Sequence, residues 1–114
     1  MRYKYESQGG DLVVLTLSGK VMGGPDFEKF HADVKNLVEE GHRRFLLDFS
    51  KVDWINSTGI GIMVSAFHSI KAAEGRMVIC GANKRVRGIY YVSKLDQIFE
   101  TFDSCDEAMR ALQA

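Results

Sequence analysis

The sequence lacks the features of disulfide-rich, membrane-spanning and secreted proteins. Its 114 residues include two cysteines, one proline and one tryptophan. Two cysteines are too few for a disulfide scaffold or for a zinc site with four thiolate ligands. No apolar run approaches the roughly 18 residues of a membrane-spanning helix, and residues 1–6 lack the apolar core of a signal peptide. We therefore expect a reduced, soluble, cytoplasmic protein without membrane insertion.

The sequence also lacks an excess of charge of either sign. Fifteen Lys and Arg residues balance fifteen Asp and Glu residues, so the formal net charge is zero. Nucleic-acid binders usually carry a basic domain, and electrostatic docking to a membrane needs a basic segment, so we expect neither. The charge is uneven along the chain, because basic residues predominate over 71–94 and acidic residues over 96–107. A solvated charged face is the simpler explanation, and a polar interface is the alternative.

The two cysteines show no sign of a reactive role. Cys80 ends the apolar run that starts at Met77, where a small buried hydrophobic residue is the simplest interpretation. Cys105 lies at the expected start of a helix, a position that can lower a thiol pKa. No catalytic partner lies near Cys105 in the sequence, so we expect both thiols to be inert.

The signatures of an enzyme are missing as well. The sequence has no Gly-x-Ser-x-Gly elbow and no Gly-x-x-x-x-Gly-Lys phosphate loop. His31, His42 and His68 lack the spacing of a metal motif. We expect no catalytic residue, no cofactor and no metal, and a small enzyme remains only as a remote alternative.

Hydrophobic periodicity divides the chain into alternating strands and helices. Strands are predicted over 3–7, 12–17, 45–49, 77–80 and 98–102. Helices are predicted to begin at Pro25, at Asn56 or Ser57, at Lys84, and after a capping Ser104. Nothing resembles an interdomain linker, so residues 1–114 form one domain. The alternation predicts an α/β fold with a mixed, mostly parallel sheet.

The most informative segment is the turn from Asn56 to Gly61. Two closely spaced glycines open a helix there, although glycine costs about 0.5–1 kcal/mol relative to alanine inside a helix. Either the first turn lies close to another backbone, or it must be open to a partner or an anion. On spacing alone, the Ser57 hydroxyl is expected to be the helix N-cap. The alternative is a phosphorylation switch, because a phosphate at this end of a helix meets unpaired N–H groups.

Residues 47–61, which include this turn, resemble the signature of the STAS domain family, the sulfate-transporter and anti-sigma-factor-antagonist family. Members typically read Asp-Ser-Ser-Gly-Leu-Gly or Asp-Ser-Thr-Gly-Leu-Gly at the position of 56–61. Three further segments are similar to family motifs: 19–21 to its Gly-Glu-Leu, 75–80 to its Gly-Gly-x-apolar strand, and 95–100 to the stretch before its last helix. The ordered set covers nearly the whole chain.

The resemblance implies a four- to five-stranded mixed sheet with about four helices mainly on one face. It implies a bacterial anti-sigma factor antagonist that acts in signal transduction and transcription regulation by partner switching. In that scheme the antagonist binds an anti-sigma factor that is a serine kinase. The kinase phosphorylates the serine that matches Ser57, with Thr58 as the other candidate acceptor, and a phosphatase resets it. The implied partner surface consists of Met22, Gly23, Gly24, Asn56, Thr58, Gly59 and Ile60, on a monomer or weak dimer.

Two positions depart from the family pattern. The residue before the phosphoacceptor is usually Asp and here is Asn56. The residue after Gly-Glu-Leu is often Asp and here is Met22. Both changes remove an acid from the expected interface. They favour the second hypothesis, a STAS scaffold or accessory subunit of a signalling or lipid-transport assembly that uses this surface without phosphorylation.

Overall fold

One five-stranded sheet, in the order β1-β2-β3-β4-β5, organises the chain. The computed structural model describes residues 2–92 and 94–113, which leaves Met1, Ser93 and Ala114 outside the description. The elements are β1 (Arg2–Ser7), β2 (Leu12–Val21), α1 (Pro25–Glu39), β3 (Arg44–Ile55), α2 (Ser57–Ala72), β4 (Arg76–Cys80), α3 (Lys84–Val92), the 3₁₀ helix η1 (Leu95–Gln97), β5 (Glu100–Phe102) and α4 (Cys105–Gln113). β1 pairs antiparallel with β2, and the other neighbours are parallel. The predicted mixed α/β fold is confirmed.

The two central strands are longer than the sequence pattern predicted. β2 continues to Val21 rather than ending at Leu17, and β3 continues to Ile55 rather than ending at Phe49. Polar residues interrupt the apolar run of β3 after Phe49, so periodicity alone ended the strand too early. The backbone pairing of Gly19 with Val52 and of Val21 with Ile55 extends both strands to the same edge.

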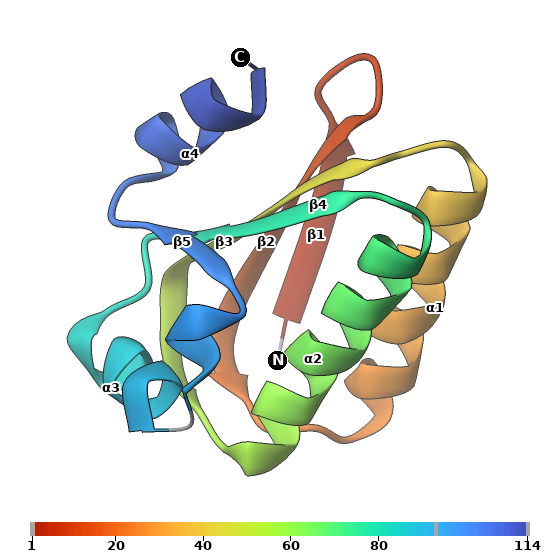
Figure 1. Ribbon diagram of the computed structural model, residues 1–114. Helices are drawn as coiled ribbons and strands as arrows, with labels where there is room; N and C mark the ends of the chain where they lie inside the picture. The colour runs from red at the N-terminus through yellow and green to blue at the C-terminus, as the bar shows by residue number, and fades with distance from the viewer. Residues whose placement is uncertain (1, 93, 114) are drawn as a thin grey trace.

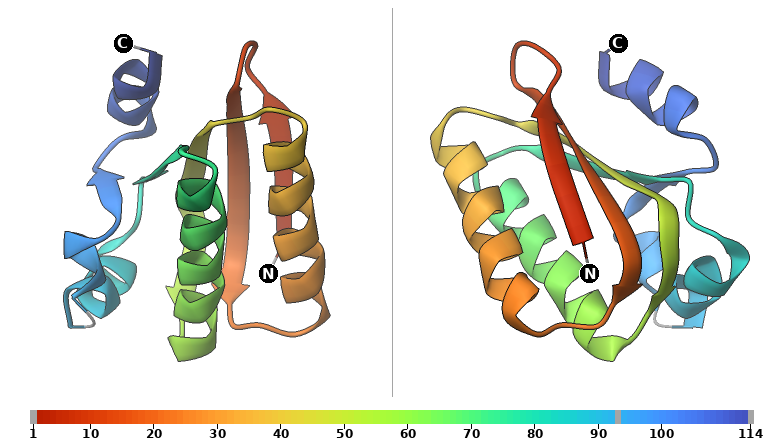
Figure 2. Two further views of the ribbon diagram at one scale, coloured as in Figure 1. Left: turned by 45° about the vertical axis from the view of Figure 1, so that its right-hand side comes forward. Right: turned by 180° about the vertical axis from the view of Figure 1, so that it is seen from behind.

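The helices divide unequally between the two faces of the sheet. α1 and α2 lie side by side on one face, and α4 lies well apart from them (Figures 1 and 2). The larger core joins α1, α2 and α3 to side chains that alternate along β3, such as Phe45, Leu47 and Phe49. On the opposite face, Ala108 and Leu112 of α4 pack in a smaller cluster with Leu12, Leu46, Val78 and Cys80. Three helices on one face and one on the other agree with the expected arrangement.

Helix α2 has one buried face and further apolar side chains that are only partly buried. Its buried residues are Gly59, Ile62, Met63, Ala66 and Ile70, whereas Ile60, Val64 and Phe67 are only partly buried. The helix is apolar on more than one side because it packs between α1 and β4. Within the described ranges, no helix has the length and apolar character needed to cross a membrane.

The expectation of two free, inert thiols was wrong. Cys80 and Cys105 form a disulfide, with a distance of 4.9 Å between their Cα atoms. Cys80 is fully buried, as predicted, but Cys105 is only partly buried. The two residues are 25 positions apart, and only the tertiary structure brings the end of β4 against the start of α4.

Two aromatic residues on strands test how much the central strand contributes to the free energy of unfolding. Phe45 of β3 is fully buried, whereas Tyr5 of edge strand β1 is 48% exposed. We expect Phe45→Ala to lower the free energy of unfolding by about 3–5 kcal/mol, because it leaves a cavity in the main core. Tyr5→Ala should lower it by less than about 1 kcal/mol. Urea unfolding of both variants measures the difference, and similar losses would contradict this account of the core.

Candidate functional site at the first turn of α2

The parallel pairing of β2 and β3 creates the site. Val21 and Ile55 are partners at the ends of these strands, so the segments that follow them leave the sheet together. Asn56 also donates its backbone N–H to the Val21 carbonyl at 3.3 Å. The loop 22–24 and the first turn of α2 are therefore neighbours, as the family resemblance implied.

Asn56, and not Ser57, caps helix α2. The Gly59 N–H donates to Asn56 Oδ1 at 2.8 Å, and the extended backbone of Asn56 is typical of an N-cap residue. An amide oxygen accepts this hydrogen bond as an aspartate oxygen would, but it adds no charge. The change from the usual acid therefore preserves the cap and leaves the first turn of α2 without an acidic residue.

Ser57 is the first residue of the helix and is exposed to solvent. Its hydroxyl has no hydrogen-bond partner among the described residues, because Asn56 already serves as the cap. The backbone N–H groups of Ser57 and Thr58 likewise make no hydrogen bond to the described part of the chain. An exposed hydroxyl thus lies beside two unpaired donors at the positive end of the α2 dipole, where an anion is stabilised.

The loop before α1 packs directly against this turn. Gly23 has a φ of 95°, and a Cβ built on it would lie only 2.6 Å from Thr58 Cγ2. The left-handed backbone favours glycine at position 23, and a Cβ there would also force the Thr58 side chain to move. Next to it, the Met22 side chain is 44% exposed, which is unusual for a large apolar side chain.

The two glycines of the turn have different physical roles. A Cβ on Gly59 would lie 2.0 Å from the Val21 carbonyl oxygen and 2.7 Å from Ile55 Cγ1, so the backbones could not approach as they do. A Cβ on Gly61 would meet nothing within 4 Å, and Gly61 is exposed. Close packing, one of the two reasons left open by the sequence, holds for Gly59. The space around Gly61 is open, so packing does not require glycine there.

The residues that the sequence assigned to the partner surface do not all reach solvent. Met22, Gly24, Ser57 and Thr58 are exposed, Gly23, Asn56 and Ile60 are partly buried, and Gly59 is buried. Gly59 therefore positions the turn from inside the protein. Gly61 belongs to the exposed surface, although the sequence interpretation did not include it. Its helical spacing from Ser57 and Thr58 was the signal that could have identified it.

Asn83 stabilises this edge of the sheet and was missed from the sequence. Its Nδ2 donates to the Val52 and Asp53 carbonyls at 3.1 and 3.3 Å, while its Oδ1 accepts from the Val86 N–H at 2.9 Å. One side chain thus caps α3 and holds the last part of β3. An Asn directly before a helix start was the available signal.

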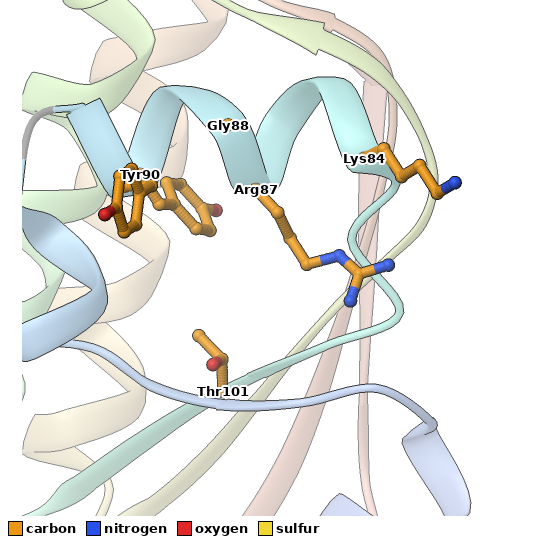
Figure 3. Close-up of a pocket in the computed structure, with 6 residues that line it drawn as sticks. Lys84, Arg87, Gly88, Tyr90 and Thr101 are labelled. Atoms are coloured by element: carbon orange, nitrogen blue, oxygen red, sulfur yellow. The ribbon is translucent and has the colours of Figure 1, made fainter.

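A separate groove of about 520 Å³ lies between α3 and β5 (Figure 3). It is lined by Lys84, Arg87, Gly88, Tyr90, Tyr91 and Thr101, none of which belongs to the α2 turn. The Tyr90 hydroxyl is buried without a hydrogen-bond partner among the described residues, and burial raises its pKa. Arg87 is already paired with Asp103 at 3.0 Å. The groove is therefore separate from the α2 turn.

One cluster of potential metal ligands occurs in the described ranges. Asp48, Cys80 and Cys105 offer ligand atoms that all lie within 4.8 Å of one another. Both sulfur atoms are joined in the disulfide, and a metal needs the free thiolate. The cluster in this oxidised state does not supply a metal site.

Comparison with known proteins gives consistent matches. The model of the STAS domain family matches residues 3–108. A relative from Bordetella bronchiseptica, BtrV, is 26% identical over 102 residues, which cover 90% of this chain and 87% of that protein. It is named provisionally as an anti-sigma factor antagonist.

Solved structures share the fold. A protein of Thermotoga maritima, also described provisionally as an anti-sigma factor antagonist, superposes with a TM-score of 0.86 at 23% identity and covers 98% of this chain and 95% of its own. The unphosphorylated form of the anti-sigma factor antagonist SpoIIAA gives a TM-score of 0.78 at 17% identity, with 99% of each chain covered. The phosphorylated form of SpoIIAA from Bacillus gives 0.76 at 18% identity, covering 96% of this chain and 98% of that one. The expected sheet and helix arrangement is confirmed.

The glycine pair provides a matched test of the turn. Gly59→Ala should lower the free energy of unfolding by about 2–3 kcal/mol, because the new Cβ collides with backbone that cannot move independently. Gly61→Ala should raise it by about 0.5–1 kcal/mol, because alanine favours the helix and open space surrounds it. Urea unfolding measures both, and a stable Gly59→Ala protein would show that the close approach is not required.

The cap provides a second test. Asn56→Ala should lower the free energy of unfolding by about 1 kcal/mol, since the Gly59 N–H loses its acceptor. Asn56→Asp keeps the acceptor and should retain or slightly increase stability through the helix dipole. Ser57→Ala is the control and should change stability by less than about 0.5 kcal/mol. A larger loss for Ser57→Ala than for Asn56→Ala would reverse the assignment of the cap.

Proposed function

We propose that this chain, which belongs to the STAS domain family, is a regulatory binding module of the anti-sigma factor antagonist type. In this proposal it acts by partner switching: it binds an anti-sigma factor when Ser57 is unmodified and releases it when Ser57 is phosphorylated. The observation that carries the proposal is the exposed Ser57 hydroxyl beside two unpaired N–H groups, with the cap supplied by Asn56. The names of the relatives, and the existence of SpoIIAA in unphosphorylated and phosphorylated forms, support it.

The geometry allows a phosphate to block binding without unfolding the domain. A phosphoserine carries about −1.5 to −2 charges at pH 7. At Ser57 these charges would face the N-terminal end of α2, where no acidic side chain of the first turn opposes them. A partner packed over the turn would instead meet a bulky dianion where it had contacted a small neutral hydroxyl.

The partner would contact a surface made by two segments. Met22, Gly24, Ser57, Thr58 and Gly61 supply its exposed part. Gly23, Asn56 and Ile60 lie at its margin, and Gly59 holds the turn in place from below. This surface combines an exposed methionine, hydroxyls and bare backbone, with no acid at the two positions where the family usually has one. The matching partner surface would therefore be apolar and close-fitting, with less basic charge than that of a partner of acidic antagonists.

The proposal assigns the chemistry to the partners. An anti-sigma factor with serine kinase activity would add the phosphate, and a phosphatase would remove it. The chain itself would act without catalytic residue, cofactor or metal, in the bacterial cytoplasm, as a monomer or weak dimer. The protein would thus be an exchangeable ligand in transcription regulation.

A second candidate function uses the same surface without phosphorylation. In this case the chain is a constitutive scaffold or accessory subunit of a signalling or lipid-transport assembly. The observation that favours it is the replacement of the usual acids by Asn56 and Met22, which changes the surface that an anti-sigma kinase recognises.

Phosphorylation by an anti-sigma kinase with ATP distinguishes these functions. We expect one phosphate on Ser57, located by tandem mass spectrometry, because Ser57 is the exposed first residue of α2. Ser57→Ala should abolish it and Thr58→Ala should retain it. Ser57→Asp should weaken binding to the kinase at least about tenfold, which corresponds to 1.4 kcal/mol.

Three outcomes would contradict the proposal in different ways. Phosphate on Thr58 would move the acceptor by one residue. Undiminished modification of Ser57→Ala at a residue outside 56–61 would exclude the turn as the phosphorylation site. A partner that binds wild type and Ser57→Asp equally would favour the scaffold.

A further inference from the structure

The Cys80–Cys105 disulfide connects two elements that meet only in the tertiary structure. Cys80 is the last residue of β4, and Cys105 is the first residue of α4. Cys80 is fully buried on the face of the sheet that α4 covers, whereas Cys105 is partly exposed. A disulfide with one accessible sulfur can be reached by a small thiol, and accessible disulfides are more often labile than fully buried ones.

Apart from this bond, α4 has few attachments to the sheet. Of its own residues, Ala108 and Leu112 are buried against the sheet, and Cys105 and Met109 are partly buried there. At its far end, Arg44 Nη1 donates to the Leu112 carbonyl at 2.5 Å and Arg76 Nη1 donates to the Ala111 carbonyl at 3.3 Å. These arginines are register partners on β3 and β4, so they hold the C-terminal end of the helix. The disulfide holds the N-terminal end.

We propose that Cys80–Cys105 is a reversible thiol–disulfide modification site, and that its reduction releases the N-terminal half of α4 from the sheet. A nine-residue helix is unstable in water without tertiary contacts, so the loss of one of its two anchored ends has a large effect. The site lies on the face of the sheet opposite α1 and α2, and it does not depend on the function proposed for the Ser57 turn.

The reaction is a thiol–disulfide exchange with a small dithiol as reductant. A thiolate of the dithiol attacks the Cys105 sulfur, the S–S bond breaks, and Cys80 leaves as a thiolate that takes up a proton. The second thiol of the reagent then attacks the mixed disulfide. The products are two protein thiols and one cyclic disulfide, so two electrons pass from the reagent to the protein.

Asp48 is placed to control the rate of this exchange. A carboxylate oxygen of Asp48 lies within 4.8 Å of both sulfur atoms, and Asp48 pairs with Cys80 across β3 and β4. Its negative charge opposes both the incoming thiolate and the departing Cys80 thiolate. Asp48 also accepts hydrogen bonds from the Ser50 N–H and hydroxyl, at 2.9 and 2.7 Å, which fix its position. Asp48 therefore slows the exchange through its charge.

Release of the N-terminal half of α4 would uncover part of an apolar surface. Leu12, Leu46 and Val78 are at most 2% exposed under α4. They come from three adjacent strands, so loosening the N-terminal half of the helix exposes part of a continuous apolar cluster on that face. An apolar fluorescent probe reports such a patch.

The experiment compares the purified full chain before and after incubation with dithiothreitol under native conditions. Alkylation and intact mass should show no free thiol before reduction and two afterwards. Hydrogen exchange of the α4 amides should become at least tenfold faster, while exchange in α1 and α2 changes less than twofold. Binding of the fluorescent probe anilinonaphthalenesulfonate should rise. Removing the reductant and adding oxidised dithiothreitol should reverse every change.

Four variants make the test specific. Cys105→Ser should show fast α4 exchange with or without reductant, and Cys80→Ala should behave in the same way. Asp48→Asn keeps a hydrogen-bond acceptor but removes the charge, so it should accelerate reduction several-fold. Ser104→Ala removes only the helix cap, in which the Glu107 N–H donates to the Ser104 hydroxyl, and its α4 exchange should still respond to reductant.

Three results would overturn the proposal. Two free thiols in the air-oxidised protein would show that the disulfide does not form. A disulfide that is reduced only in denaturant would show that it is not a reversible site in the folded protein. Unchanged α4 exchange and probe binding after complete reduction would show that the disulfide does not hold the helix.

Discussion

The close approach of Gly59 to the Val21 carbonyl is the constraint on which the candidate site depends. Because no Cβ intervenes, the first turn of α2 lies directly on the end of β2. That position brings Thr58 against Gly23 and leaves Ser57 facing solvent. The parallel register of β2 and β3 makes the approach possible, since both strands end at the same edge. The site is therefore formed by two close contacts, Gly59 with Val21 and Thr58 with Gly23, rather than by a cluster of charged side chains.

The second constraint is the division of roles between Asn56 and Ser57. A serine that caps its own helix would have its oxygen occupied by a backbone donor, and phosphorylation would disturb the cap. Here the Asn56 amide takes that role, so the Ser57 hydroxyl is free for solvent or a partner. The chain has a formal net charge of zero. A single phosphate on Ser57 would therefore change the local charge more than any nearby side chain does. Asn83 supports the same edge from α3 through its bonds to the Val52 and Asp53 carbonyls.

The two faces of the sheet are stabilised by different means. The face under α1, α2 and α3 has a large apolar core, and hydrophobic burial suffices there. The face under α4 has a small cluster, and the short helix is held by arginines at one end and a disulfide at the other. Arg87 lines the groove between α3 and β5 and forms an ion pair with Asp103. Asp103 lies two residues before Cys105 in the chain. The disulfide is therefore joined through the chain to the wall of that groove.

The sequence by itself determined the α/β class, the start of α3 at Lys84, and the turn around Ser57, because local periodicity and turn residues report these features directly. It did not determine the full lengths of β2 and β3, the choice of Asn56 over Ser57 as cap, or the separate reasons for Gly59 and Gly61. Strand ends depend on pairing with a neighbour, and either residue had a suitable capping side chain. The disulfide was beyond sequence reasoning for the same reason, since two cysteines 25 residues apart become partners only when β4 and α4 are placed against each other. Local pattern fixes what each segment becomes, and long-range packing decides which atoms meet.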